Sequence, residues 1–328
     1  MTDNAASGVR PTGSAAAKAT AASPAARAAG RPVVSSIRER TGTARPANRP
    51  RYAVKQNWFQ KNKAIVLTLG TVVAAVAIFF YIAGHQNSGP NRGNVDPQVL
   101  QQVTGVPANV FEKVGTNNLR NPMTALPAGP VLKQNGKPEI LYVGAEYCPF
   151  CAAERWSVIV ALSRFGTWQG LNTTTSATND VYPDTSTFSF VGSTYTSDYV
   201  TFVSKELQDR NRQTLQSLSK DEEAIFGKYD APPFVPQNAA GGIPFISYGN
   251  QYMGLSSGFS PQLLAGMTWE QIASKLKNPD DAATQGIVGN ANYITATICK
   301  LTDNKPGDVC NSKTIQDIQG QLPKQPNG

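Results

Sequence analysis

Histidine is nearly missing from this chain: His85 is the only one among 328 residues. Catalytic triads and many zinc sites use histidine as a base or as a ligand. A single histidine in a short polar segment provides neither a base for a nucleophile nor a His-assisted metal site. The chemistry of this protein must therefore come from other residue types.

Aromatic residues are absent from the first 50 positions, which instead contain 14 alanines and many serines, prolines and arginines. Such a segment has too little apolar surface to offset its chain entropy. The sequence therefore predicts a disordered tail over residues 1–63. This tail carries a net charge of about +10, and the rest of the chain is near neutral at about −2. A nucleic-acid-binding domain does not fit that balance, so we expect no nucleic-acid partner.

Charge is absent from residues 64–83, a run of 20 mostly apolar residues. A helix of this length spans about 30 Å, the thickness of the hydrocarbon core of a bilayer. Six basic residues lie in the 20 positions before the run, and only Arg92 lies in the 20 positions after it. The positive-inside rule then places the N-terminus in the cytoplasm. We expect a single-pass protein of the cell membrane, with the lipid bilayer as one partner and an extracytoplasmic C-terminal domain.

Composition divides the part of the chain that follows the predicted span. Residues 84–95 are polar and rich in glycine and asparagine, which predicts a linker. Residues 96–320 are predicted to form one domain, and residues 321–328 a polar tail. Strand-like and helical patterns follow one another along the domain, which indicates an α/β fold. Residues 166–200 are rich in threonine and serine and are interpreted as an insertion.

Local patterns predict the elements of this domain. Two hairpins are expected around Asn135-Gly136 and Gly249-Asn250, because these dipeptides tolerate the positive φ angles of tight turns. Strands are predicted at 140–143, 187–192 and 200–205. Helices are predicted at 97–103, 149–165, 215–229, 268–276 and 282–299.

Cysteine occurs only four times, always after the predicted span, in a compartment where disulfides persist. Spacing favours the pairs Cys148–Cys151 and Cys299–Cys310. A four-cysteine zinc site is an alternative, but the ten residues between Cys299 and Cys310 do not match the usual ligand spacing. We therefore expect no metal and no cofactor. The second pair is interpreted as a structural disulfide, with a redox shuttle as its alternative.

The first pair stands where a predicted strand gives way to a predicted helix. If Cys148 is the N-cap, its sulfur faces free N–H groups and the positive end of the helix dipole, and both favour the thiolate. Cys151 lies one turn later on the same face and can resolve a mixed disulfide. A structural bridge gains little from so small a ring. The spacing thus indicates a redox-active pair, with Pro149 and Phe150 completing the active-site loop.

Three charged residues flank this pair: Glu146, Glu154 and Arg155. An ionised carboxylate at Glu146 would oppose formation of a thiolate on Cys148. We expect the three charges to lie on a solvated face, where an ion pair contributes under about 1 kcal/mol. No role is assigned to them.

The cysteine pair and the later stretch "GGIPFIS" together resemble the thioredoxin superfamily, in which a cis-proline loop faces the dithiol. The resemblance implies an elaborated thioredoxin-like fold over about residues 131–276, with Ile243 and Pro244 binding an extended substrate chain. In addition, "YVGAEYCPFCAAERW" and the single anchor resemble an uncharacterised family of membrane-anchored thioredoxin-like proteins of actinobacteria and archaea. Tyr142 stands where thioredoxins have a buried acid.

Two classes of function are consistent with these features. The first is a membrane-anchored extracytoplasmic thiol–disulfide oxidoreductase, whose partners are cysteine-containing exported proteins or a redox partner protein. Cys148 and Cys151 would be its catalytic residues. The alternative is a non-catalytic thioredoxin-like module that binds or assembles a membrane or envelope complex. Loss of both cysteines would abolish the first function and leave the second unchanged.

Overall fold

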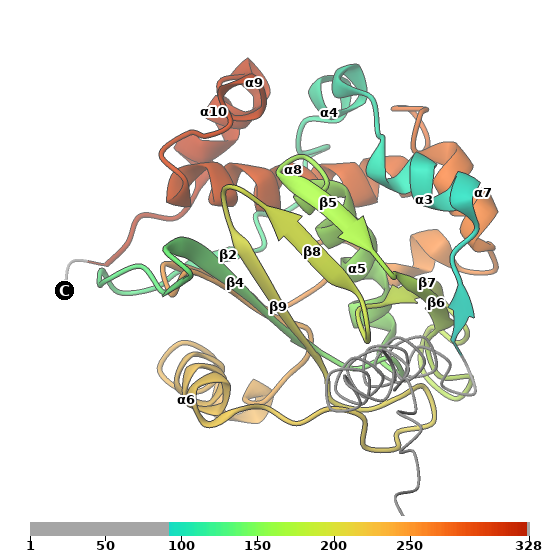
Figure 1. The fold of residues 1–328 in the computed structure, drawn as a ribbon, viewed down its shortest axis with the longest axis horizontal. Helices are drawn as coiled ribbons and strands as arrows, with labels where there is room; N and C mark the ends of the chain where they lie inside the picture. The colour runs from blue at the N-terminus through green and yellow to red at the C-terminus, as the bar shows by residue number, and fades with distance from the viewer. Residues whose placement is uncertain (1–91, 327–328) are drawn as a thin grey trace, which may run out of the picture. The chain divides into compact units, whose positions relative to one another are not determined.

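A mixed six-stranded sheet lies at the centre of the region that the computed structural model describes, residues 92–326 (Figure 1). The central strand β4 (Lys137–Gly144) pairs in parallel with β9 (Thr201–Glu206) and antiparallel with β3 (Lys133–Gln134) and β10 (Phe245–Tyr248). The predicted α/β fold is confirmed at this level. The remaining strands are β2 (Met123–Ala125) and β11 (Tyr252–Gly254), in the order β2–β11–β10–β4–β3.

The predicted disordered tail, residues 1–63, and the predicted transmembrane helix, residues 64–83, lie outside the described residues. Within the described range, no helix has both the length and the apolar character needed to cross a membrane. The described part begins inside the predicted linker. There, β1 (Gly93–Asn94) pairs with β6 (Asn172–Thr175), so the end of the linker segment contacts the domain.

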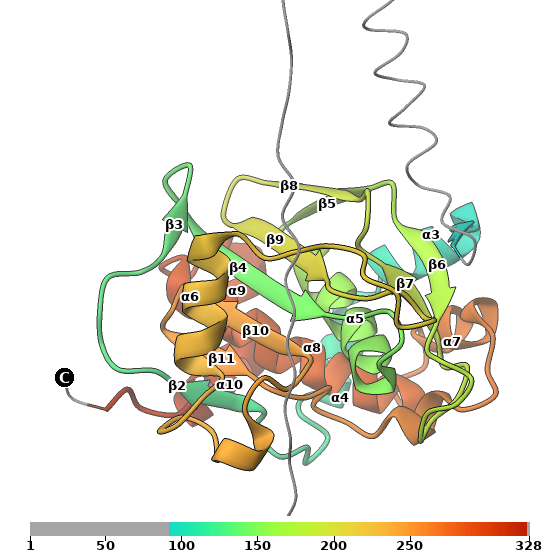
Figure 2. The same ribbon diagram turned by 90° about the horizontal axis from the view of Figure 1, so that it is seen from below.

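Helices cover both faces of the central sheet (Figures 1 and 2). On one face lie α5 (Pro149–Leu162) and α8 (Ala282–Leu301), and on the other lies α6 (Lys220–Tyr229). Successive side chains of a strand point to opposite faces. In β4, Tyr142 therefore joins the larger core beneath α5 and α8, whereas Leu141 joins the smaller core beneath α6.

The predicted insertion, residues 166–200, forms two small sheets beside α5. The indole N–H of Trp156 donates to a carbonyl of β7 (Ser186–Ser189) at 2.9 Å. The hydroxyl of Thr187 donates to the carbonyl of Ala152 at 2.7 Å. Small hydroxyl side chains thus let this buried strand pack against the helix. One sheet pairs β6 with β1 and β7, and the other pairs β5 (Gly166–Gln169) with β8 (Thr194–Ser197).

Turn residues place both hairpins where the sequence predicts them. Asn135 and Gly136 have φ angles of 52° and 78°, and Gly249 and Asn250 have φ angles of 60° and 55°. These are left-handed conformations that glycine and asparagine adopt most readily.

The remaining helices are α3 (Pro97–Thr104), α4 (Ala108–Val114), α7 (Trp269–Lys275), α9 (Gly307–Cys310), α10 (Lys313–Gln321), and the 3₁₀ helices η1 (Gln237–Ala239) and η2 (Pro261–Leu264).

Helix α6 begins later than the predicted range 215–229. Ser219 accepts a hydrogen bond from the N–H of Glu222, and the carboxylate of Glu222 accepts one from the N–H of Ser219. This capping box starts the helix at Lys220. The predicted strand 187–192 also ends early, at Ser189, because the following residues form a turn.

The predicted disulfide between Cys299 and Cys310 is present, joins α8 to α9, and is buried. Its residues are 11 positions apart, and by loop-closure entropy a ring of this size stabilises the folded state by about 3 kcal/mol.

Beyond α10, Leu322 is buried against the core. The segment predicted as a polar tail, residues 321–328, therefore starts within α10, and its second residue packs on the domain.

Candidate functional site

Cys148 and Cys151 lie at the start of α5, in the loop that follows β4. Cys148 is the N-cap of the helix and Pro149 is its first residue, as the sequence predicts. The Sγ of Cys148 accepts a hydrogen bond from the backbone N–H of Cys151 at 3.2 Å. Both thiols are free, so the structure represents the reduced pair. The first sulfur thus occupies the position where unpaired N–H groups and the helix dipole stabilise a negative charge.

The two thiols differ in how readily they ionise. The hydrogen bond from the Cys151 thiol, followed by the Cys151 N–H and the charge of Arg155, lowers the pKa of Cys148, against burial, which raises it. Burial raises the pKa of Cys151 well above its usual value, and the hydrogen bond and charge of Cys148 raise it further. Cys148 is therefore the more nucleophilic sulfur, and Cys151 retains its proton.

The Ile243–Pro244 peptide lies against Cys148. The thiol of Cys148 donates to the carbonyl oxygen of Ile243 at 3.7 Å, and the Ile243–Pro244 bond is cis. Strand β10 starts directly after Pro244, and its first residue, Phe245, pairs with Val143 near the end of β4. This antiparallel pairing carries the proline to the loop that holds the cysteines. The structure thus brings the two predicted catalytic residues and the two predicted substrate-binding residues together.

The other predicted site residues have distinct surroundings. Pro149 is buried in the first turn of α5, whereas the Phe150 side chain is exposed. Cys299 and Cys310 are fully buried in their disulfide, so exchange with the dithiol would require local opening. Among residues 92–326, no group of three or more His, Cys, Asp or Glu side chains is arranged to hold a metal ion.

A fully buried ion pair lies next to the dithiol. Arg155, one turn after Cys151, donates to the two carboxylate oxygens of Glu206 at 2.8 and 2.6 Å and to the carbonyl of Ala145 at 2.7 Å. Glu206 ends β9, the parallel neighbour of β4, so the pair joins α5 to the edge of the sheet that bears the cysteine loop. The expectation that Arg155 lies on a solvated face is wrong, because every residue of α5 except Phe150 is buried.

Tyr142 packs in the same buried region. Its ring contacts that of Phe190, with centroids 5.1 Å apart. Its hydroxyl is buried and has no hydrogen-bond partner within the part of the chain that the structure describes. Burial raises the pKa of Tyr142 well above its usual value, so the hydroxyl stays neutral. The charge that acts on both cysteines is therefore the guanidinium of Arg155 rather than an acid on β4.

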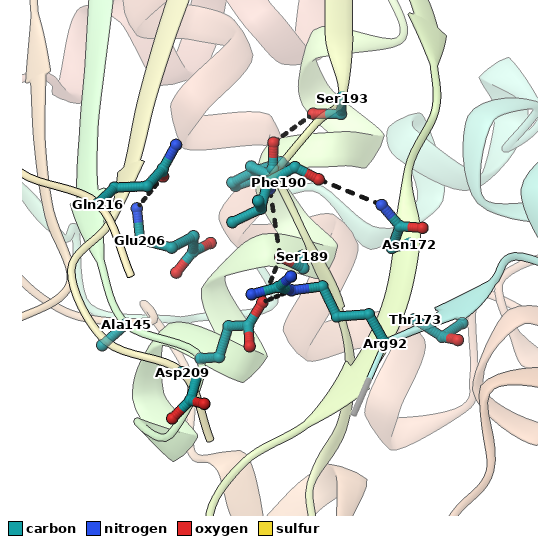
Figure 3. Close-up of polar contacts among 12 residues, drawn as sticks. Arg92, Ala145, Asn172, Thr173, Ser189, Phe190, Ser193, Glu206, Asp209 and Gln216 are labelled. Atoms are coloured by element: carbon teal, nitrogen blue, oxygen red, sulfur yellow. Dashed lines mark hydrogen bonds and ion pairs between the residues drawn. The ribbon is translucent and has the colours of Figure 1, made fainter. Parts of the chain in front are cut away.

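Glu146, two residues before Cys148, is buried as well, and the expectation of a solvated carboxylate is wrong. Its carboxylate accepts hydrogen bonds from the guanidinium of Arg92 and from the hydroxyl of Ser189. Figure 3 shows the Arg92 side chain extending towards Ser189. The pairing of β1 with β6 brings Arg92 to this position. We call residues 92–95 the N-terminal arm; through Arg92, it contacts the loop that holds the dithiol.

Glu154 is buried on the side of α5 that faces α8, so the expectation of a solvated face is wrong here too. The side-chain amide of Asn290 donates to its carboxylate at 2.7 Å and to the carbonyl of Ser257 at 3.0 Å. Glu154 forms no salt bridge with any residue of the described range. Burial raises the pKa of Glu154 well above its usual value, outweighing the hydrogen bond from Asn290, which lowers it.

Replacing Glu154 by glutamine is expected to flatten the dependence of stability on pH. With a raised native pKa, the folded protein holds a proton that the unfolded chain releases. The stability that neutral Glu154 contributes is thus complete below the unfolded pKa of 4.5 and is lost as pH rises towards the native pKa. Urea midpoints measured between about pH 4.5 and 9 should fall more steeply for the wild type than for Glu154→Gln.

The matched control for this prediction is Glu223→Gln, which removes an exposed carboxylate on α6. Its urea midpoints should follow those of the wild type across the pH range. Parallel curves for the wild type and Glu154→Gln would show that Glu154 has the same pKa in the folded and unfolded states.

The roles of Arg155, Glu206 and Glu146 were not predicted from the sequence. One signal was available: the helix that follows the cysteines is apolar on every face, so a charge within it must be buried and paired. No pattern in the sequence indicated which residues pair with Arg155 and Glu146. Glu206 lies 51 residues after Arg155, and Arg92 lies 54 residues before Glu146.

A family described as "Domain of unknown function (DUF929)" matches residues 129–300, more than half of the chain. This range contains the dithiol, the Ile243–Pro244 peptide and the Arg155–Glu206 pair. No curated protein and no solved structure matches the chain significantly. The function of the site must therefore be argued from its own geometry.

Proposed function

Because the chain belongs to the DUF929 family, a domain of unknown function, we propose an activity from the site itself: thiol–disulfide exchange with cysteines of exported proteins, through Cys148 and Cys151. The observation that carries this proposal is the position of the Cys148 sulfur, at the N-cap of α5 and 3.7 Å from the carbonyl oxygen of Ile243. A purely structural pair needs no thiol of lowered pKa at a helix terminus.

The proposed exchange has two steps. The Cys148 thiolate attacks one sulfur of a client disulfide, forming a Cys148–client bond, and the other client sulfur leaves as a thiolate that takes up a proton. Cys151 then loses its proton and attacks the Cys148 sulfur, which releases the second client thiol and leaves a Cys148–Cys151 disulfide. Two electrons pass from the protein to the client, and the two client sulfurs take up the proton released by Cys151 and one proton from solvent. An external dithiol regenerates the protein, and the reverse sequence oxidises a client.

The Ile243–Pro244 segment supports the binding of a client chain at the sulfur. Its backbone lies beside Cys148, where an extended segment can form main-chain hydrogen bonds with Ile243. Pro244 has no N–H, so it does not extend the hydrogen-bonded ladder at this point. We assign Ile243 and Pro244 to client binding on this basis.

The thioredoxin-like fold also belongs to this proposal. In support of it, the parallel strands β4 and β9 are connected through α5, and the antiparallel hairpin β10–β11 continues the sheet. The dithiol stands at the start of the connecting helix, and the cis-proline precedes β10. The two small sheets formed by residues 166–200 elaborate this arrangement.

We place the domain on the outer side of the cell membrane, attached to the bilayer by the helix predicted at residues 64–83. The disulfide between Cys299 and Cys310 supports this location, because such bonds persist in oxidising compartments. Clients there are exported proteins whose cysteines pair or rearrange outside the cytoplasm. No metal or cofactor is needed for the exchange.

Substitution of each cysteine tests the proposed activity. With insulin as the disulfide substrate and dithiothreitol as the dithiol, the full chain should accelerate reduction, and Cys148→Ser should reduce the rate to that of dithiothreitol alone. Cys151→Ser should retain attack but accumulate mixed disulfides, which non-reducing electrophoresis detects. If the wild type neither accelerates reduction nor forms mixed disulfides through Cys148, the proposal is wrong.

A non-catalytic binding or assembly module is the second candidate. One observation favours it: the Cys148 side chain is only 6% exposed, which restricts approach to the sulfur. A module of this kind would retain a stable partner when both cysteines are replaced by serine. Co-purification from membranes of the wild type and of the double variant separates the two functions.

A further inference from the structure

Few large apolar side chains are exposed in the described range, and one of them, Phe150, belongs to the turn that holds the dithiol. The exposed set consists of Phe150, Val181 and Leu263, at 39%, 71% and 37%. Phe150 lies between the two cysteines in sequence. Val181 belongs to the loop of residues 176–185, which connects β6 to β7 within the insertion.

This loop is attached directly to the cysteine loop. The backbone N–H of Ala177 donates to the carbonyl of Tyr147, the residue before Cys148, at 2.9 Å. The ring of Tyr182 meets that of Phe150 edge to face, with centroids 5.8 Å apart. Val181 therefore stands next in sequence to a side chain that touches the active-site loop. We call Phe150, Val181 and Tyr182 the apolar wall.

Two partly exposed ion pairs also contact the loop. Arg210 pairs with Asp184 at 2.6 Å, and Arg212 pairs with Asp180 at 2.9 Å. These contacts connect it to the segment that follows β9. An exposed valine in a loop held at several points is preorganised for a contact, since little conformational entropy is lost when a partner covers it.

The surface around Tyr147 is polar by comparison. The guanidinium of Arg212 lies 4.3 Å from the centre of the Tyr147 ring. A cavity of about 290 Å³ next to Arg212 is lined by Thr178, Asn179, Arg210, Asn211 and Arg212. Arg210 and Arg212 are both paired with aspartates, so their charges are partly compensated within the protein. Besides Ile243, which lies against Cys148, the exposed apolar side chains on this side of the cysteine loop are those of the wall.

We propose that the apolar wall selects clients in which an apolar side chain adjoins the reacting cysteine. This inference rests on the proposed exchange activity and names the substrate class of the same site. A client sulfur bonded to Cys148 places the neighbouring client residues over the first turn of α5, where Phe150 projects. An apolar neighbour removes Phe150 and Val181 from water, whereas a polar neighbour loses its own hydration.

The two ion pairs position the loop that carries Val181 and Tyr182, and they do not involve the reacting sulfurs. The insertion thereby acquires a role that the minimal sheet and helices do not provide. Client preference is set by a loop far from Cys148 in sequence, and exchange chemistry is set by the helix terminus.

Single-turnover kinetics with peptide probes test the selection. Each probe is a short peptide with one cysteine in a mixed disulfide with thionitrobenzoate, and its residue before or after the cysteine is leucine in one version and serine in the other. Attack of Cys148 on the peptide sulfur releases coloured thionitrobenzoate as the thiolate. Cys151 then displaces the peptide thiol, so no added reductant is needed.

For the reduced wild-type full chain, at least one leucine probe should react about 10-fold faster than its serine counterpart. Val181→Ser should reduce this ratio to about 3 or less, and Phe150→Ser should act in the same direction. The matched control is Leu263→Ser, which removes an exposed apolar side chain that lies against Gly286 on α8. It should preserve the ratio.

The outcomes separate the two proposals. If thionitrobenzoate release is no faster than in Cys148→Ser, the exchange activity itself is absent. If release depends on Cys148 but the leucine and serine probes react equally, or the ratio survives in Val181→Ser, the wall does not select clients. The ratio within one variant cancels any general change in Cys148 reactivity, including one caused by Phe150→Ser.

Discussion

The Arg155→Met variant is expected to unfold with a free energy about 3–5 kcal/mol lower than that of the wild type. The substitution leaves the Glu206 carboxylate buried without its partner and removes the donor to the Ala145 carbonyl. An unpaired buried charge is much more costly than the loss of an exposed one. Urea unfolding of the two proteins measures the difference in the free energy of unfolding. The slope of that free energy against urea concentration should be the same for both proteins.

A double variant separates the buried charge from general damage to the core. Arg155→Met combined with Glu206→Leu removes both charges and should regain most of the lost stability. The matched control is Lys313→Met, which breaks an exposed pair with Asp317 and should change stability by less than about 1 kcal/mol. If Arg155→Met changes the urea midpoint no more than this control does, the pair contributes nothing to the fold.

The same variant has a redox consequence. After the hydrogen bonds from Cys151, the positive charge of Arg155 contributes to the lowered pKa of Cys148, and it offsets part of the rise that burial causes in the pKa of Cys151. In Arg155→Met the thiolate of Cys148 should therefore form at higher pH, which ultraviolet absorbance of the thiolate reports. This shift tests an electrostatic contribution that a purely structural role of Arg155 would not produce.

The Arg92→Met variant should lose about 3 kcal/mol, the lower end of the range for a broken buried pair. Glu146 is almost completely buried, and the Arg92 guanidinium is the only cationic group paired with it among residues 92–326. The N-terminal arm can detach and admit water to Glu146, which limits the loss. Urea unfolding measures the change in stability.

An uncompensated carboxylate two residues before Cys148 should also raise the pKa of that thiol. Arg92→Met combined with Glu146→Gln removes the charge and should restore the Cys148 pKa, and with it part of the stability. If Arg92→Met has the stability and the Cys148 pKa of the wild type, Arg92 and Glu146 do not form an ion pair when the protein is in solution. The restored pKa in the double variant is the readout that a simple loss of packing would not give.

Much of the local structure could be predicted because local physics decides it. The positive φ angles at Asn135-Gly136 and Gly249-Asn250 required asparagine and glycine, and both hairpins formed there. The cysteine spacing indicated an N-cap sulfur, and Cys148 caps α5. Such interactions involve residues within about four positions of one another, so a single chain segment contains all the information.

The sequence by itself therefore determined the α/β class, the hairpins, the cap at Cys148 and the pairing of Cys299 with Cys310. Only the tertiary structure decided the environment of the dithiol. Burial converts Arg155 and Glu146 from surface charges into members of ion pairs whose partners lie over fifty residues away. The physical reason is that a charge next to the cysteines acts on their pKa according to its burial and its partner, and both depend on which distant strands pack against α5.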